Sequence, residues 1–129
     1  MPEHIERRKR RSEDPIVALH YQLSTVRRGA EFEAVVLVDD AGCLVAGAGA
    51  WPVCQELAAY APFLAHRQET RSGAVATRAT EIARDAHVRS MEIDGTEVLL
   101  CALGGGSAEA TSWIVRAAAG CRRILRAEC

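Results

Sequence analysis

Residues 31–48 read EFEAVVLVDDAGCLVAGA, a short apolar run, a polar break and a second apolar run. This pattern predicts two β-strands joined by a tight turn. In the first run, residues 35–38 are β-branched or aliphatic without interruption, which is typical of a strand covered on both faces. A chain this small can cover both faces of a sheet only with helices. The stretch therefore predicts a hairpin within a sheet that has helices packed on it.

The length and composition indicate one folded domain. The 129 residues match the size of an ordinary domain, and 49% hydrophobic with 26% charged residues is close to the average of a globular protein. No apolar run approaches the roughly 18 residues that a membrane-spanning helix needs. The N-terminus is charged where a signal peptide would be apolar, so we expect a cytoplasmic protein.

Residues 1–13 are predicted to form a disordered basic tail, and residues 14–129 a single domain. The tail carries a block of like charges, which repel one another in any compact form. Such an arm can bind nucleic acid or an anionic membrane, but it has no interleaved aromatic residue to stack on bases, so a solvated tail is favoured. The basic residues are Arg7, Arg8, Lys9, Arg10 and Arg11.

A first helix is expected to begin at Asp14-Pro15, because aspartate is a good N-cap and proline is favoured at the first helical position. Its apolar stripe recurs at spacings of three and four, and Gly29 stands where the helix is expected to end. His20 and Tyr21 lie beside the stripe and are predicted to be a partly buried, hydrogen-bonded pair rather than a catalytic couple. The stripe consists of Ile16, Leu19, Leu23 and Val26.

A second helix is expected to begin at Trp51-Pro52, again with proline at the first position. Pro62 is expected to kink this helix or to end its regular part, because proline has no N–H for the helical hydrogen bond. Three aromatic residues, Trp51, Tyr60 and Phe63, cluster around it, which fits either a partner surface or ordinary core packing. One face of the helix holds Val53, Leu57, Leu64 and either Tyr60 or Ala61.

Residues 67–86 fit two patterns. Val75, Ala79 and Ile82 would form one side of a short helix, whereas alternation through Thr77 would form a strand, and the helix is favoured. The chain then repeats the hairpin pattern, with Asp94-Gly95 as a strong signal for a type I′ turn. The run 98–103 is apolar throughout, which indicates a central strand. The most inaccessible side chains are expected to be Val36, Val38, Leu99, Cys101 and Leu103.

Gly104, Gly105 and Gly106 lead into a last helix, with Ser107 as its expected N-cap. A glycine-rich turn before a helix can hold a phosphate, but the spacing fits neither the dinucleotide fingerprint nor the P-loop, so a flexible turn is favoured. The apolar stripe of this helix is expected to comprise Trp113 or Ile114, Ala117 or Ala118, Cys121 and Leu125.

The five cysteines are odd in number and lack the close pairs of zinc or redox motifs. Cys43 and Cys101 are expected in strands, and Cys54 and Cys121 in helices, where a thiol packs as a small apolar group. Cys129, at the end of the chain, is the one for which we expect exposure.

Two motifs resemble the Roadblock/LC7 family. EAVVLVDDAGCLVA, residues 33–46, follows the first helix, and MEIDGTEVLLCALGGG, residues 91–106, precedes the last. A typical first hairpin of that family has a polar break of the form D-x-x-G or D-x-G, which Asp39, Asp40 and Gly42 fill here. The likeness covers about residues 14–126 and implies an α+β protein. It would be an α/β/α sandwich, with a mainly antiparallel sheet of four or five strands and helices on both faces.

Related sandwiches, the GAF-like and profilin-like domains, show similar patterns. The chain also departs from the Roadblock/LC7 pattern. That family usually has three strands between the second and the last helix, and only two are clear here, unless residues 74–80 supply another. The departure bears on the strand order and on the edge through which such proteins usually pair.

The resemblance implies a non-enzymatic regulatory or scaffold protein, homodimeric, that binds a small Ras-like GTPase or its associated machinery. The sequence contains no constellation that points to a catalytic, cofactor-binding or metal site, and Asp39-Asp40 is better explained by turn chemistry than by metal binding. The alternative is a GAF-like domain that senses a small molecule in a pocket between sheet and helices.

The resemblance to a dimeric family makes the second hairpin a candidate interface. A hairpin that ends a small sheet leaves one strand edge unpaired, and residues 88–93 are the expected edge. Two copies could pair there antiparallel about a two-fold axis, with the second helix of each beside the join. The candidate interface residues are Val53, Leu57, Tyr60, Leu64, Val88, Met91 and Ile93.

Overall fold

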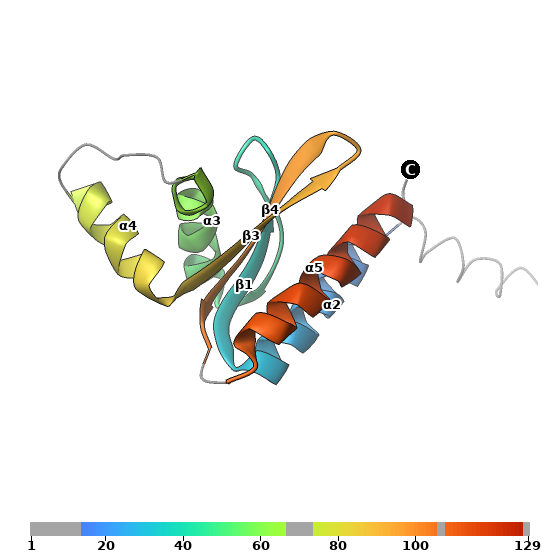
Figure 1. Cartoon of the computed structure of the whole chain (residues 1–129), viewed down its shortest axis with the longest axis horizontal. Helices are drawn as coiled ribbons and strands as arrows, with labels where there is room; N and C mark the ends of the chain where they lie inside the picture. Colours follow the sequence, from blue (N-terminus) through green and yellow to red (C-terminus); the bar gives the residue numbers. More distant parts are fainter. Residues whose placement is uncertain (1–13, 67–73, 106–107, 128–129) are drawn as a thin grey trace, which may run out of the picture.

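A computed structural model of the chain describes residues 14–66, 74–105 and 108–127 (Figure 1). The predicted basic tail, the Ser107 N-cap and Cys129 lie outside the described residues. No helix in the described part of the chain is long and apolar enough to span a membrane. The elements are α2 (Pro15–Ala30), β1 (Phe32–Val38), β2 (Leu44–Gly49), α3 (Trp51–His66), α4 (Ala74–Asp85), β3 (Ala86–Ile93), β4 (Thr96–Gly104) and α5 (Ala110–Ala127).

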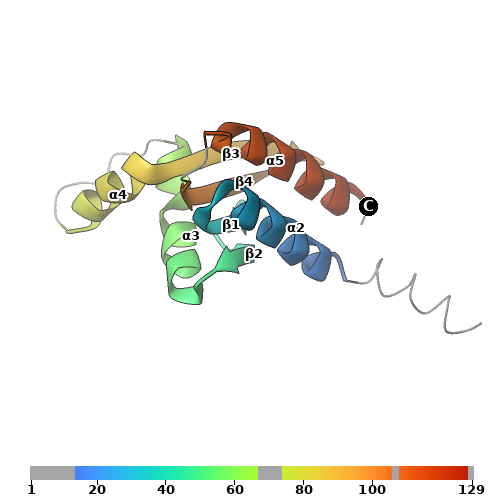
Figure 2. The ribbon, with the colours of Figure 1, turned by 90° about the horizontal axis from the view of Figure 1, so that it is seen from below.

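Within the described residues, the strands form one antiparallel sheet of four strands in the order β2-β1-β4-β3. Helices α2 and α5 lie on one face of this sheet and α3 and α4 on the other (Figures 1 and 2). The predicted α/β/α sandwich, both hairpins and the helix within residues 67–86 are therefore confirmed. Residues 74–80 lie in α4 and supply no strand, so the described residues between α3 and α5 form two strands where the Roadblock/LC7 pattern usually has three.

The central strands β1 and β4 are buried on both faces, as their uninterrupted apolar runs predict. Val35 and Leu37 pack under α2 and α5, whereas Val36 and Val38 pack under α3, and all four are fully buried. Leu99 and Cys101 are buried as expected, but Leu103 is only half-buried. It lies one residue from the end of β4, beside the small Ala86 of the edge strand, where the helical cover ends.

Gly29 does not end α2. The helix continues to Ala30 and is closed by Glu31, which adopts a left-handed conformation with φ of 60°. Gly29 is instead needed for packing, because a Cβ at this position would overlap the indole ring of Trp113 on α5. At the other end, Pro15 occupies the first turn as predicted, while Asp14 makes no capping hydrogen bond with its side chain.

His20 and Tyr21 do not form a pair. Tyr21 is 74% exposed, whereas His20 is half-buried and its Nδ1 contacts the backbone of Gly47 on β2. They point in different directions because neighbouring residues on a helix are about 100° apart around the axis. The stripe through Leu19, Leu23 and Val26 is fully buried, as predicted, but Ile16 is 42% exposed at the start of the helix.

Two further predictions concern α3 and Cys43. Helix α3 continues through Pro62 to His66, so the proline does not end it. Cys43 was expected in a strand but is exposed in the first hairpin turn, because Asp39 extends that turn. The carboxylate oxygen Oδ1 of Asp39 accepts hydrogen bonds of 2.9 Å from the backbone N–H groups of Ala41 and Cys43. Asp39 is thus a turn residue, as predicted.

Candidate protein interface

The two edges of the sheet differ. On the outer side of β2, Nδ1 of His20 lies 2.8 Å from the carbonyl oxygen of Gly47 and 3.3 Å from its nitrogen. Because both backbone groups of Gly47 meet this side chain from α2, they point away from β1 and are covered. An additional strand would have to displace these contacts to pair with β2.

The other edge, β3, is more open. Asp94 and Gly95 have φ of 52° and 80°, and Ile93 pairs with Thr96 across this two-residue turn. In such a hairpin the flanking pair is hydrogen-bonded, so the even-numbered residues of β3 turn their N–H and C=O groups outward. Apart from Ala86, which directly follows α4, these residues are Val88, Ser90 and Glu92. Among the described residues, one contact reaches these groups: an Nη2 of Arg122 donates 3.1 Å to the Glu92 carbonyl.

The predicted interface residues fall on opposite faces of the sheet. Met91 and Ile93 face α5, at 5% and 7% exposure, and Leu57 of α3 is at 1%, so these three belong to the core and offer little surface. The half-buried members all pack against the core on the α3 face of the sheet. They are Val53, Tyr60, Leu64 and Val88. The structure thus places the α3 residues and Val88 on one face of the sheet, and Met91 and Ile93 on the other.

A short hydrogen-bond chain ties the open edge to the end of α3. The hydroxyl of Ser90 donates to Oε2 of Glu97 at 2.7 Å, and Nε2 of His66 lies 2.8 Å from Oε1 of the same carboxylate. The hydrogen bond from Ser90, together with that from His66, lowers the pKa of Glu97 below its ordinary value. Because the carboxylate stands between the two, the imidazole does not touch the hydroxyl and cannot take its proton. The chain is structural, not nucleophilic.

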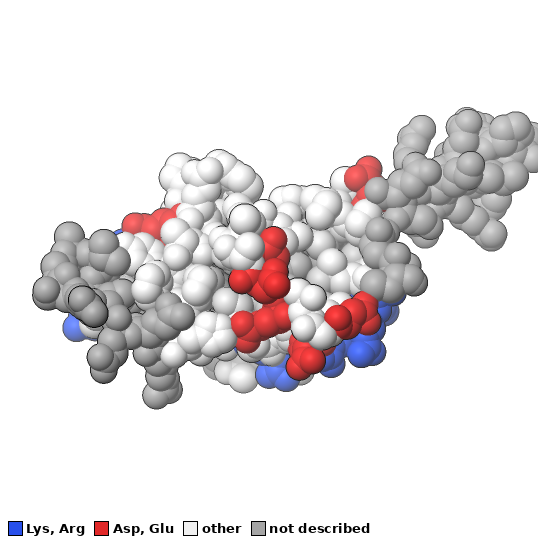
Figure 3. Space-filling view, turned by 90° about the horizontal axis from the view of Figure 1, so that it is seen from above, with Lys and Arg blue, Asp and Glu red and all other residues white. Residues whose placement is uncertain are grey.

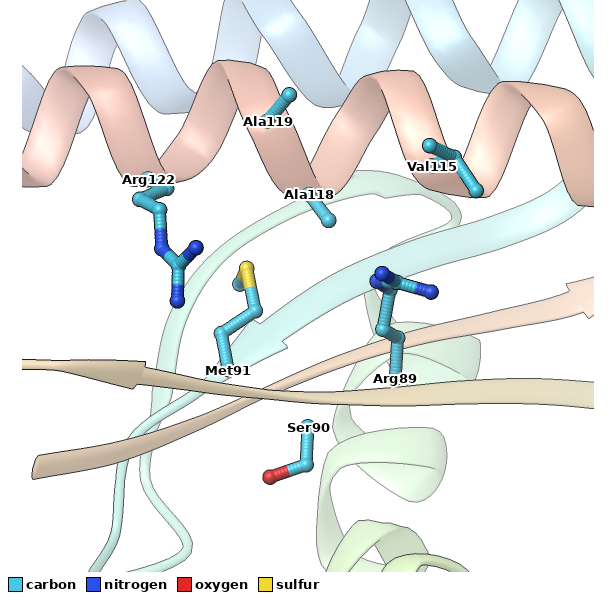
Figure 4. A pocket seen from close by; sticks show the side chains of 7 residues that line it. All are labelled: Arg89, Ser90, Met91, Val115, Ala118, Ala119 and Arg122. Atoms are coloured by element: carbon cyan, nitrogen blue, oxygen red, sulfur yellow. The ribbon is translucent and has the colours of Figure 1, made fainter.

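On the α5 side of the edge lies a groove of about 190 Å³ that the sequence alone did not reveal. We call it the Arg89–Arg122 groove. Figure 4 shows the side chains of Arg89 and Arg122 reaching into it from β3 and α5, on either side of Met91, while the Ser90 side chain points away. The groove is lined by Arg89, Ser90, Met91, Val115, Ala118, Ala119 and Arg122. Basic and apolar groups therefore meet at one place on the surface.

Carboxylates gather elsewhere. Figure 3 shows acidic side chains on the end of the molecule where Figure 1 places both hairpin turns. The turns contribute Asp39, Asp40 and Asp94, of which Asp39 is engaged with its own turn. Within the described residues, no group of three or more histidine, cysteine or acidic side chains is placed to hold a metal ion.

Comparisons with known proteins bear on the fold. The sequence matches no protein-family model and no curated protein. The structure matches that of Myxococcus xanthus MglB with a TM-score of 0.54 and 15% sequence identity, over 88% of this chain and 92% of that one. MglB is a Roadblock/LC7 protein, so the match confirms the Roadblock-like fold that the two hairpin motifs predict. At this identity the likeness concerns the fold alone.

Proposed function

We propose that this protein is a non-enzymatic regulator or scaffold, which acts as a homodimer and binds a small Ras-like GTPase or its associated machinery. The fold supports this proposal, because it is the one that the Roadblock/LC7 resemblance implies. The observation that carries it is the difference between the two sheet edges. His20 covers β2, whereas β3 leaves outward backbone groups at Val88 and Ser90 without a contact among the described residues.

Antiparallel pairing of two β3 strands about a two-fold axis restricts the register. Outward-facing residues must meet outward-facing ones, so the axis passes through a residue of β3. An axis at Arg89 would place the two Arg89 side chains directly opposite each other, and like charges in that position are destabilising. An axis at Ser90 avoids this conflict and sets Val88 of each copy opposite Glu92 of the other. We therefore favour the axis at Ser90.

The half-buried residues of α3 add to the proposed join. Tyr60 and Leu64 stand on the same face as Val88, and the end of α3 is linked through Glu97 to Ser90, so a second copy would cover them as it pairs with the edge. Val53, at the start of α3 near β2, is further from this edge. Backbone pairing would fix the register of the two strands. This apolar surface would add the buried area that a stable dimer needs. Met91 and Ile93 are excluded from contact by α5 and act in the protomer core.

Light scattering at micromolar concentration tests the assembly by measuring the molar mass. We expect the mass of a dimer, twice the 13.9 kDa of one chain. Ser90→Pro removes an outward N–H and should give a folded monomer, since proline is tolerated on an open strand edge. Ser90→Ala keeps the N–H while losing the hydroxyl, and should remain dimeric. Proline at the neighbouring position 91 would not serve this purpose, because Met91 is buried and pairs inward with Val98. A wild-type monomer would remove the homodimer from the proposal.

The GTPase part is tested with tagged protein and a lysate of the native host. Captured proteins should include a small GTPase, which is then purified, loaded with GDP or with a GTP analogue, and titrated against the wild type and Ser90→Pro. Binding that depends on the loaded nucleotide supports a regulatory role. Failure of every purified GTPase to bind directly would contradict the proposal.

A further inference from the structure

We propose that the Arg89–Arg122 groove is a docking site for a carboxylate-bearing segment of a partner protein. The partner's glutamate or aspartate would lie between the two guanidinium groups, and an adjacent aliphatic side chain would lie against the apolar walls. The inference rests on the proposed function in that it names where the partner binds and what chemistry the partner offers. The groove itself is a property of the protomer.

The shape of the groove fits a side chain. Its floor is formed by Met91 and Ala118, at 5% and 6% exposure, and Val115, at 47%, forms an apolar wall. Alanines at 118 and 119 leave room where larger residues of α5 would fill the space between helix and strand. Apolar walls beside paired cations favour a carboxylate on an aliphatic stem over a strongly hydrated phosphate, although both anions would meet the same guanidinium groups.

The charge of the groove is uncompensated. Neither Arg89 nor Arg122 forms an ion pair with a carboxylate among the described residues, and the one hydrogen bond of Arg122, to the Glu92 carbonyl, holds its side chain in place without neutralising it. Other arginines are differently engaged. Arg78 is paired with Glu56 and Glu81, and the Arg116 guanidinium lies 5.0 Å from the centre of the Trp113 ring. Two cations facing one groove favour an anion between them.

A second copy of this chain does not supply that anion through strand pairing. The β3 residues that face α5 are the odd-numbered ones, His87, Arg89, Met91 and Ile93, and none is acidic. In antiparallel pairing, opposite residues point to the same face, so the carboxylate of Glu92 stays on the α3 face of a paired sheet. The paired strand of a second copy is thus excluded as the ligand, and we assign the ligand to a different protein. In a dimer joined at β3, two such grooves would lie on one face, on either side of the axis.

The test uses the full chain and two fluorescent peptides, one that alternates glutamate and leucine and one that alternates glutamine and leucine. Fluorescence anisotropy should show binding of the glutamate peptide alone, weakened by added salt. Arg89→Ala and Arg122→Ala should each weaken binding about tenfold or more, since each removes a charge-assisted contact. Arg116→Ala, on the same helix but over Trp113, is the matched control and should bind like the wild type. Circular dichroism verifies that each variant is folded.

Several results would overturn the docking site: equal binding of both peptides, unchanged binding by Arg89→Ala, or full displacement by millimolar inorganic phosphate, which would indicate a general anion site. The Ser90→Pro variant separates this inference from the proposed dimer. If the protein is monomeric and still binds the glutamate peptide through both arginines, the docking site is supported and the homodimer is contradicted. If the dimer forms and no acidic peptide binds, the docking site is contradicted and the homodimer is not.

Discussion

The imidazole of His20 on α2 lies against the outer backbone of Gly47 on β2, 2.8 Å from its carbonyl oxygen. One side chain thus occupies the position that the next strand of a larger sheet would take. This contact covers the outward backbone of Gly47, which is why the proposed pairing uses the other edge of the sheet.

Replacing His20 should both destabilise the protein and uncover β2. His20→Ala removes one hydrogen bond and should lower the free energy of unfolding by about 1 kcal/mol. It also frees an edge strand that has no charged residue, so we expect assemblies larger than the wild type. Urea unfolding and light scattering measure the two effects. Tyr21→Ala, at the exposed neighbouring position, should change neither, and equal behaviour of both variants would contradict a protective role for His20.

Gly29→Ala tests the contact between α2 and α5. In an exposed helix this change stabilises by up to about 1 kcal/mol, but here the new methyl group would overlap the Trp113 ring. We expect a loss of about 1 to 3 kcal/mol in the free energy of unfolding, from overpacking. Gly120→Ala is the control, because the neighbouring group there is the flexible end of Gln22, which can move. The double change with Trp113→Leu should recover much of the loss.

The attachment of α4 should depend on acid pH. Arg78 on α4 donates to both carboxylate oxygens of Glu56 on α3, at 3.0 Å and 2.5 Å, and this hydrogen bonding lowers the pKa of Glu56 below its ordinary value. A lowered folded-state pKa means that the stabilisation is present above the unfolded-state pKa and is lost as the pH falls through the folded-state value. Acid-active proteolysis within residues 74–85 should therefore rise as the pH falls below the ordinary pKa of a glutamate and through the lowered value of Glu56. Glu56→Gln should show less of this rise, and an equally steep rise would contradict the assignment.

Thiol reactivity should separate Cys43 from the buried cysteines. Burial raises the pKa of Cys101 and of Cys121 to about 12, and it also raises that of Cys54, so these thiols stay protonated near pH 8. Cys43 is exposed. In a Cys129→Ser background, a thiol reagent should label one group quickly and the others only after urea is added. The fast phase should disappear in Cys43→Ser; its persistence would mean that a buried thiol is accessible.

The hairpins and the helical layers could be predicted from the sequence because each is encoded locally. Uninterrupted apolar runs mark β1 and β4, the Asp94-Gly95 pair marks a two-residue turn, and the stripe through Leu19 and Leu23 marks the buried face of α2. Each of these signals depends on neighbours a few residues away. Tertiary contacts did not override them.

What the sequence did not reveal depends on residues far apart in the chain. Gly29 is a common helix-ending residue, and its real role becomes visible only when Trp113 is placed over it. The apolar run after Asp39 suggested that Cys43 lies in a strand, because the two turn-extending hydrogen bonds of that carboxylate cannot be read from composition. The groove could not be predicted without the register of β3 and the rotation of α5 about its axis, because Arg89 and Arg122 are far apart in the sequence and lie close only in the fold.

The β1–β4 seam also bears on how fast the chain folds. Val36 pairs with Gly47 on one side and with Cys101 on the other. Both hairpins join neighbouring segments and can form early. The pairing of β1 with β4, which we call the seam, closes a long loop, so its formation costs more chain entropy. Seam formation should therefore set the refolding rate. In stopped-flow experiments, Leu100→Ala in the seam should slow refolding, while Ile93→Val near the second turn should mainly speed unfolding. If Leu100→Ala changed only the unfolding rate, the two halves of the sheet would join after the barrier.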